Sequence, residues 1–334
     1  MASYPCIPNY TYFDSPEFFK LLLHIITIIS TPMYLLGLYC ILFKTPAVMK
    51  TVKLYLLVLH VMITLLDYSV SILTVPYLMF PQVAGIPFGL LRYLGVPTSF
   101  QTALVLMILA SVAISSISIY ENRYFILCDF RGKQHWRVLR RFWLFFHYLY
   151  CASLLSIVLL ILPDQKPAIA RMFQSLPCLP EFLYKEPVLV ILESNIFPAI
   201  ALALFLFVLA VELAIFISQL LINIQLQQKT ARISQKTYQA QKQFLFALFT
   251  QSSTLVITMI FPVSFGIWAF FMNYYNQAAI NLCIIIGIPH GFIATVVMLW
   301  VHKPYRLAVK ELFGAMDKNL QRRIKVTPMS VSQY

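Results

Sequence analysis

The sequence predicts an all-α membrane protein, a bundle of seven helices that cross the bilayer. Sixty per cent of the 334 residues are apolar and 11% are charged, whereas about a quarter of the residues in an ordinary soluble domain are charged. The apolar residues gather in runs of about the 20 residues that one bilayer crossing needs. We expect one domain over residues 1–320, with a tail over residues 302–334.

The spans are read from apolar runs in which charged residues are few. They cover residues 18–43, 54–79, 97–120, 142–162, 191–222, 244–271 and 278–301. The first run ends at Lys44, and the second follows Lys53 and contains Asp67 as its single charge. The third ends at Glu121, and Arg141 precedes the fourth. Charged residues therefore mark the predicted edges of the hydrocarbon region.

The last three spans need more argument. The fifth has an acid near each end, Glu193 and Glu212. Residues 243–301 contain no Asp, Glu, Lys or Arg, and this stretch is far longer than one crossing. It must form two helices, and the polar residues 272–277 supply the turn between them.

The distribution of positive charge predicts the orientation. Twenty Lys and Arg residues lie in connections 44–53, 123–141 and 223–243 and in the tail from residue 302, against five on the other side. Cytoplasmic loops carry the excess of positive charge, so we expect the N-terminus outside and the C-terminus in the cytoplasm. Residues 304–320 have the spacing of an amphipathic helix on the inner leaflet. Asn9 begins a glycosylation sequon on the outer side.

Polar residues inside the spans predict an interior network. A carboxylate in hydrocarbon is costly, so Asp67 should face the bundle and find polar partners. The candidates for this network are His60, Asp67, Ser111, Ser115 and His290. No metal-ligand spacing accompanies the histidines or cysteines, so we expect neither a metal site nor a cofactor.

A switch motif lies at the inner end of the third span, where Glu121, Asn122, Arg123 and Tyr124 follow one another. An acid two residues before an arginine allows the guanidinium to be held in one state and released in another. The alternative is an interfacial arginine that snorkels to the head groups.

This tetrad resembles the acid-Arg-Tyr motif of rhodopsin-like receptors, and nearly the whole chain resembles the nematode serpentine chemoreceptors of class H. The resemblance is carried by residues 14–18, 43–46, 49–50, 59–60, 75–77, 80–81, 85, 89–90, 95–98, 121–124, 177–180, 289–291 and 302–306. It implies a G-protein-coupled receptor on the cilium of a chemosensory neuron, with an odorant or pheromone-like ligand and a heterotrimeric G protein as partners. Two rhodopsin-like features are missing, a cysteine at the outer end of helix three and an Asn-Pro-x-x-Tyr pattern in helix seven.

The resemblance also suggests roles for single residues. Glu121, Arg123 and Tyr124 would form the switch. Asp67 is similar to the helix-two acid that binds sodium in many rhodopsin-like receptors, and a protonated carboxyl is the open alternative. Pro262 would act as a hinge in helix six.

A ligand pocket is expected among the outer halves of helices three, five, six and seven. Its candidate residues are Gln101, Val105, Glu193, Asn195, Phe265, Trp268 and Asn281. The apolar surroundings favour a small hydrophobic molecule, and Glu193 leaves room for a cation. Aromatic residues at helical spacing are more often packing residues than pocket residues.

Cys6 and Cys178 are the two cysteines on the predicted outer, oxidising side. We therefore predict that they form a disulfide. The alternative is that each stays free.

Other functions fit less well. A transporter or channel, the main alternative, should show duplicated halves or a continuous polar path, and neither is evident. An enzyme needs converging catalytic groups, but the acids and histidines do not cluster and no catalytic motif is present. The net charge of +13 lies in loops that meet anionic lipid and a cytoplasmic partner, so we expect no nucleic-acid ligand.

Overall fold

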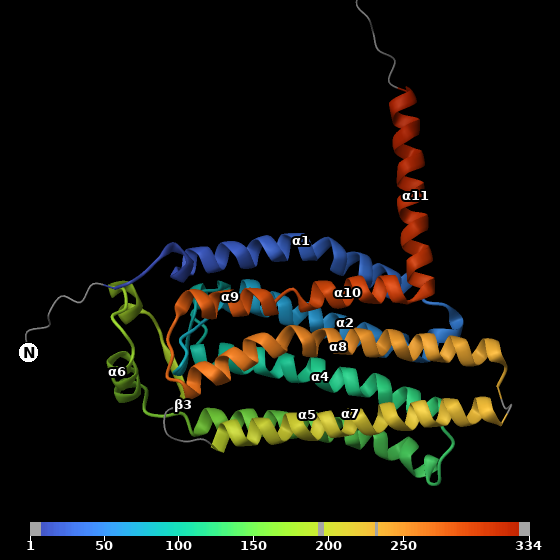
Figure 1. Cartoon of the computed structure of the whole chain (residues 1–334), viewed down its shortest axis with the longest axis horizontal. Helices are drawn as coiled ribbons and strands as arrows, with labels where there is room; N and C mark the ends of the chain where they lie inside the picture. The colour runs from blue at the N-terminus through green and yellow to red at the C-terminus, as the bar shows by residue number, and fades with distance from the viewer. Residues whose placement is uncertain (1–7, 193–196, 231–232, 327–334) are drawn as a thin grey trace, which may run out of the picture.

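The computed structural model of the chain describes residues 8–192, 197–230 and 233–326. Within these residues, seven helices are long and apolar enough to cross a membrane. They lie side by side along one axis, as Figure 1 shows. The predicted fold class, a seven-helix membrane bundle, is confirmed.

The spanning helices are α1 (Pro16–Phe43), α2 (Lys50–Tyr68), α4 (Thr98–Leu127), α5 (Lys133–Leu160), α7 (Phe197–Lys229), α8 (Gln235–Phe271) and the consecutive pair α9 (Gln277–Gly287) and α10 (His290–Val301). Side chains cap several of their N-termini. Ser15 Oγ accepts the Phe18 amide at 3.1 Å ahead of α1. Asn276 Oδ1 accepts the Ala279 amide at 3.0 Å ahead of α9. These bonds satisfy amides that the first helical turn leaves unpaired.

Two spans differ from the predicted ranges because short apolar runs do not distinguish a strand from a helix. The second was expected over residues 54–79. After α2 the chain makes a π-helical turn over Ser69–Thr74, turns at Val75 and enters a strand at Pro76, whose ring cannot continue a helix. The fifth was expected from residue 191, but Leu189–Leu192 form a strand and α7 begins at Phe197.

Several helices also extend past the apolar runs that predicted them. The third and fourth were expected over residues 97–120 and 142–162, whereas α4 continues to Leu127 and α5 begins at Lys133. The fifth span was expected to end at residue 222 and the sixth to begin at residue 244. Polar turns extend α7 to Lys229 and start α8 at Gln235. Charged residues mark where hydrocarbon ends, but good helix formers such as Lys, Gln and Arg let a helix continue into water.

A small sheet covers one end of the bundle. It consists of β1 (Pro76–Leu78), β2 (Val83–Pro87) and β3 (Leu189–Leu192), antiparallel in the order β1-β2-β3. Two short helices lie beside these strands in the chain. Helix α3 (Leu90–Tyr93) connects β2 to α4, and α6 (Gln165–Ser175) lies between α5 and β3. Gln165 pairs with the edge of β3, because its Oε1 accepts the Val190 amide at 3.0 Å and its Nε2 donates to the Val190 carbonyl at 3.1 Å. We call this the sheet end.

The N-terminal segment is tied to the sheet end. Asp14 Oδ1 accepts the Ala278 amide of α9 at 2.8 Å, and the Tyr77 hydroxyl donates to the Asp14 carbonyl at 2.5 Å. Asn281 Nδ2 donates to the Phe13 carbonyl at 3.0 Å. These bonds fix the start of α1 against α9 and β1.

The opposite end carries α11 (Lys303–Val326), and we call it the tail-helix end. Figure 1 shows α11 running across the direction of the bundle. It covers the amphipathic helix predicted over residues 304–320 and continues for a further turn and a half. The position of this helix on the inner leaflet stays a prediction.

Candidate functional site

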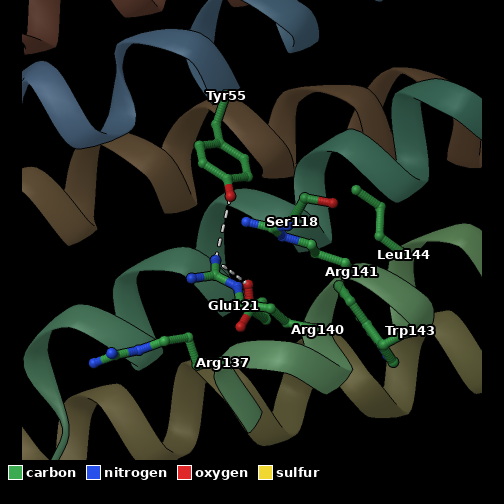
Figure 2. Close-up of a pocket in the computed structure, with 8 residues that line it drawn as sticks. All are labelled: Tyr55, Ser118, Glu121, Arg137, Arg140, Arg141, Trp143 and Leu144. Carbon is green, nitrogen blue, oxygen red and sulfur yellow. Dashed lines mark hydrogen bonds and ion pairs between the residues drawn. The ribbon is translucent and has the colours of Figure 1, made fainter. Parts of the chain in front are cut away.

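A buried acid organises the tail-helix end of α4. Glu121 is 2% exposed. Its Oε2 accepts a hydrogen bond of 2.6 Å from Arg140 Nη2 of α5, and its Oε1 accepts one of 2.7 Å from Trp136 Nε1. Arg140 Nη2 also donates to the Tyr55 hydroxyl of α2 at 3.2 Å and to Asn122 Oδ1 at 3.1 Å. Figure 2 shows the Arg140 guanidinium between Glu121 and Tyr55. These five residues, the Glu121 cluster, join α2, α4 and α5.

Arg123 contacts a different helix. Its guanidinium carbon lies 3.8 Å from the centroid of the Phe244 ring on α8. Its Nε has no hydrogen-bond partner within the described part of the chain. The expectation that Glu121 holds Arg123 is therefore corrected for this structure, because residues two apart on a helix do not face each other. The acid binds α5, and the arginine packs against α8.

His302 continues this contact toward α11. Its ring centroid lies 5.4 Å from that of Phe244 and 5.5 Å from that of Tyr305. The Tyr305 hydroxyl is 2.9 Å from Thr45 Oγ1 at the end of α1. Burial, aided by the positive charge of Arg123, lowers the pKa of His302 to about 4. His302 is therefore neutral at pH 7 and fits beside a cation.

Tyr124, the last member of the predicted switch, packs away from Arg123. Its ring stacks on Phe130 with 4.8 Å between centroids. One turn further, Asn223 and Gln227 of α7 both donate to the Leu127 carbonyl at 2.9 Å. These bonds satisfy a carbonyl that the end of α4 leaves free, and they hold α7 against α4.

A polar network lies inside the bundle around Asp67, which is 5% exposed. The Tyr34 hydroxyl of α1 donates to Asp67 Oδ2. His290 Nδ1 of α10 lies 3.2 Å from Asp67 Oδ1, and His60 Nε2 lies 3.0 Å from the Tyr34 carbonyl. The network therefore joins α1, α2 and α10.

The two serines expected in this network do not reach it. Ser111 Oγ donates to the Met107 carbonyl of its own helix at 2.8 Å. Ser115 Oγ is buried and has no hydrogen-bond partner among the residues that the structure describes. Tyr34, which sequence reasoning did not propose, supplies the hydroxyl instead. Its hydroxyl lies in a mostly apolar span that also contains Thr27, Ser30 and Thr31, so the sequence did not single it out.

Two glycines let the helices approach this network. A Cβ on Gly37 would lie 2.7 Å from His60 Cε1, and a Cβ on Gly291 would collide with Asp67 Oδ2. Small residues at such crossings allow close packing of membrane helices. Any larger residue at Gly291 would therefore displace the Asp67 carboxylate.

A cavity of about 270 Å³ lies at the sheet end, between α4 and the three strands. Gln101 and Val105 line it on the α4 side, and none of the described lining residues is Asp, Glu, Lys, Arg or His. Gln101 Nε2 donates to the Val96 carbonyl at 2.8 Å. A cavity of about 150 Å³ accommodates benzene in an apolar interior, so this space suits a somewhat larger neutral molecule.

Three other predicted pocket residues lie outside this cavity. Phe265 and Trp268 of α8 pack on each other with 5.9 Å between ring centroids, and Trp268 is 46% exposed. Asn281 is fully buried and accepts a hydrogen bond of 3.0 Å from Gln277 Nε2. The cavity forms between α4 and the sheet because residues 76–87, expected as helix and connection, fold into strands that cover α4.

Some predictions concern residues outside the described ranges. Glu193, Asn195 and Cys6 are among them. Cys178 is disulfide-bonded, and its pairing with Cys6 stays a prediction. Asn9 is exposed, and its glycosylation stays a prediction as well.

Sequence reasoning missed the partners at the tail-helix end. Arg140 was grouped only with the basic residues of the connection 123–141, and Trp136 and Phe244 were given no role. Trp136 and Arg140 are four residues apart, and such residues share one face of a helix. This spacing, one turn before an apolar run, could have indicated a paired contact for a buried acid.

A bundle of seven membrane helices with a cavity at one end and buried charges at the other is compatible with the class of seven-helix receptors. The family model for the serpentine type seven-transmembrane G-protein-coupled chemoreceptor Srh matches residues 14–315. The chain is also similar to serpentine receptor class H-72 of Caenorhabditis elegans, with 28% identity over 312 residues, 92% of this chain and 89% of the relative. The chain belongs to the Srh chemoreceptor family, as the sequence resemblance predicted, and it is a multi-pass membrane protein.

Proposed function

We propose that this chemoreceptor binds a small external molecule in the sheet-end cavity and activates a heterotrimeric G protein at its tail-helix end. The family supports the receptor function, and the distribution of positive charge supports an outer sheet end and a cytoplasmic tail-helix end. The single observation that carries the coupling mechanism is the Arg123–Phe244 contact between α4 and α8. It lies at the end of the bundle opposite the cavity.

The cavity favours a neutral, largely apolar ligand. Its described walls carry no ionisable side chain, and a charged ligand would lose its hydration without a counter-charge. Gln101 Oε1 is buried there without a hydrogen-bond partner among the described residues. An uncharged molecule of about ten heavy atoms, with most of its surface apolar, matches this volume and chemistry.

Activation would separate α8 from α4. Pro262 lies within α8 and removes a backbone hydrogen bond, which makes it a suitable hinge. Outward movement of the Phe244 end would free the Arg123 guanidinium. A free arginine inside a basic opening could then bind carbonyl or carboxylate groups of a G protein.

The test is nucleotide exchange on purified G protein in proteoliposomes that contain the receptor. A cation–π contact contributes about 0.5–2 kcal/mol, so Phe244→Ala should raise basal exchange by about 2–30-fold. Arg123→Ala should abolish exchange. Phe246→Ala is the matched control, because this phenylalanine of the same helix is 62% exposed. If neither Phe244→Ala nor Arg123→Ala changes the rate of nucleotide exchange, the coupling proposal is wrong. A current that the ligand opens in the absence of G protein would favour a channel instead.

The cavity is tested separately with a panel of volatile and water-soluble compounds. Val105→Phe fills the cavity and should weaken the response to an active compound by at least tenfold. Leu109→Phe is the control, since Leu109 lies one turn further along α4, is 37% exposed and does not line the cavity. If Val105→Phe and Leu109→Phe changed the response to the compound by the same amount, the ligand would bind elsewhere.

The orientation is tested by the accessibility of tags at the two chain ends in intact cells. Microscopy of a tagged receptor tests its expected place on a sensory cilium.

A further inference from the structure

A second pocket lies beside the Glu121 cluster and has the opposite chemistry to the sheet-end cavity. Its volume is about 270 Å³, and Figure 2 shows its walls. Arg137, Arg140 and Arg141 all line it, together with one acid, Glu121. The four charged side chains leave the pocket with a net charge of two positive units.

The three arginines share one face of α5 because they are spaced by three and four residues. Arg140 is occupied by Glu121 and Tyr55. Arg137 and Arg141 are exposed and make no ion pair within the described ranges. Like charges four residues apart destabilise a helix. A bound anion would offset the repulsion between Arg137 and Arg141.

The start of the apolar run of α5 places the pocket near the expected depth of a lipid phosphate. The charge-free run of α5 begins with the residue after Arg141, so the guanidinium groups lie at the membrane boundary. Phe142 and Phe145, on the following turn, are 56% and 59% exposed, which suits contact with acyl chains. Trp143 lines the pocket itself, and tryptophan is enriched at membrane interfaces. An occupant with both a phosphate and acyl chains matches these surroundings.

We propose that this pocket binds the phosphomonoester head group of an anionic phospholipid. A phosphomonoester carries about −1.5 to −2 charges at pH 7, which matches the net charge of the pocket. Arg137 and Arg141, which extend on either side of the Arg140–Glu121 pair in Figure 2, would each donate to phosphate oxygens. The Tyr55 hydroxyl accepts from Arg140 and keeps its own hydrogen for a further bond to phosphate.

The site also has a consequence for the Glu121 cluster. A phosphate bound here competes with Glu121 for Arg140. By linkage, a change that weakens the Arg140–Glu121 bond must strengthen lipid binding. Glu121→Gln removes the competing charge and should therefore tighten binding of the phosphomonoester lipid. The site does not depend on the proposed G-protein coupling.

The experiment is native mass spectrometry of the full chain, released from nanodiscs of phosphatidylcholine that contain a few per cent of test lipid. Phosphatidic acid and phosphatidylinositol 4-phosphate carry the phosphomonoester, whereas phosphatidylserine carries a singly charged head group. We expect retention of one phosphomonoester lipid in preference to phosphatidylserine. Arg137→Gln with Arg141→Gln should lower the affinity about 30-fold, since each basic residue near the surface contributes about 1 kcal/mol.

The control is the pair Arg131→Gln and Lys229→Gln, which removes the same charge from exposed positions that do not line the pocket. Equal losses in the two double variants would indicate diffuse surface attraction and overturn the site. Displacement of the lipid by millimolar inorganic phosphate or soluble inositol trisphosphate would make a soluble anion the occupant and also overturn it. Weaker binding by Glu121→Gln would contradict the competition for Arg140.

Discussion

Removing Arg140 should destabilise the protein far more than its place near a membrane surface would suggest. The Glu121 side chain is 3% exposed and that of Arg140 15%. Arg140 is the one cation in the described structure that forms an ion pair with Glu121. Removing one partner of a buried pair costs about 3–5 kcal/mol, because the remaining charge is buried without compensation. We expect Arg140→Gln to lower the free energy of unfolding by about 3 kcal/mol.

The double variant separates the charge from the rest of the contact. Glu121→Gln with Arg140→Gln leaves no buried charge, so its loss should be only about 1–2 kcal/mol. Glu121→Gln alone leaves Arg140 with Tyr55 and Asn122 and should cost about 1–2 kcal/mol. The sum of the two single losses therefore exceeds the double loss by about 2–4 kcal/mol, the coupling energy of the pair.

The assay is reversible unfolding of the purified chain by sodium dodecyl sulfate in mixed micelles, followed by circular dichroism. Arg131→Gln provides the baseline for loss of an exposed arginine of the same end. Additive single losses, or an Arg140→Gln loss no larger than that of Arg131→Gln, would refute the reasoning. Either result would mean that Glu121 is compensated by water or protonation and not by Arg140.

Three further predictions use the same unfolding assay. Gly291→Ala should lower the free energy of unfolding by about 1–3 kcal/mol, because the new methyl group collides with the Asp67 carboxylate. The control Gly314→Ala has open space around it and should lower it by nothing. Equal effects of the two changes would contradict this packing. Tyr34→Phe should cost about 1.5–3 kcal/mol by removing the donor to that carboxylate, and Tyr68→Phe should cost less. His302 has its pKa lowered from 6.5 to about 4, so the unfolded chain takes up its proton first and stability should fall as the pH drops from about 6.5 to 4, by at most about 3 kcal/mol. His302→Gln should reduce this slope, and an unchanged slope would assign it to other groups.

The sequence predicted the number of membrane helices because the signal is large and local. Each run carries few or no charges over about the thickness of the hydrocarbon, and a helix satisfies all of its backbone groups within such a run. The strands at residues 76–78 and 189–192 escaped prediction for the same reason. They are as apolar as the helices beside them, and residues 189–192 pair with the strand at residues 83–87, which lies more than a hundred positions earlier in the chain.

Contacts between helices were harder to predict than the helices. Asp67 could be placed in the interior because burial of a charge is so unfavourable. Its partner Tyr34 could not be chosen, since that choice depends on how α1 is rotated against α2. Glu121 shows the same limit. Its position two residues before Arg123 suggested a local pair, and helix geometry instead directs the acid to α5 and the arginine to α8.

The second helix is the element that touches both the cavity and the buried network. Thr74 lines the cavity at the sheet end, and Asp67 lies two turns away along the same chain. Between them the backbone makes the π-helical turn, in which Thr74 Oγ1 donates to the Ser69 carbonyl at 2.8 Å and Ser71 Oγ donates to the Asp67 carbonyl at 2.7 Å. Hydroxyl groups thus satisfy carbonyls that an irregular turn would leave unpaired in hydrocarbon. Because a π-helical turn is less regular than the neighbouring α-helix, a ligand in the proposed cavity that displaced Thr74 would first distort the segment that also bonds to Asp67.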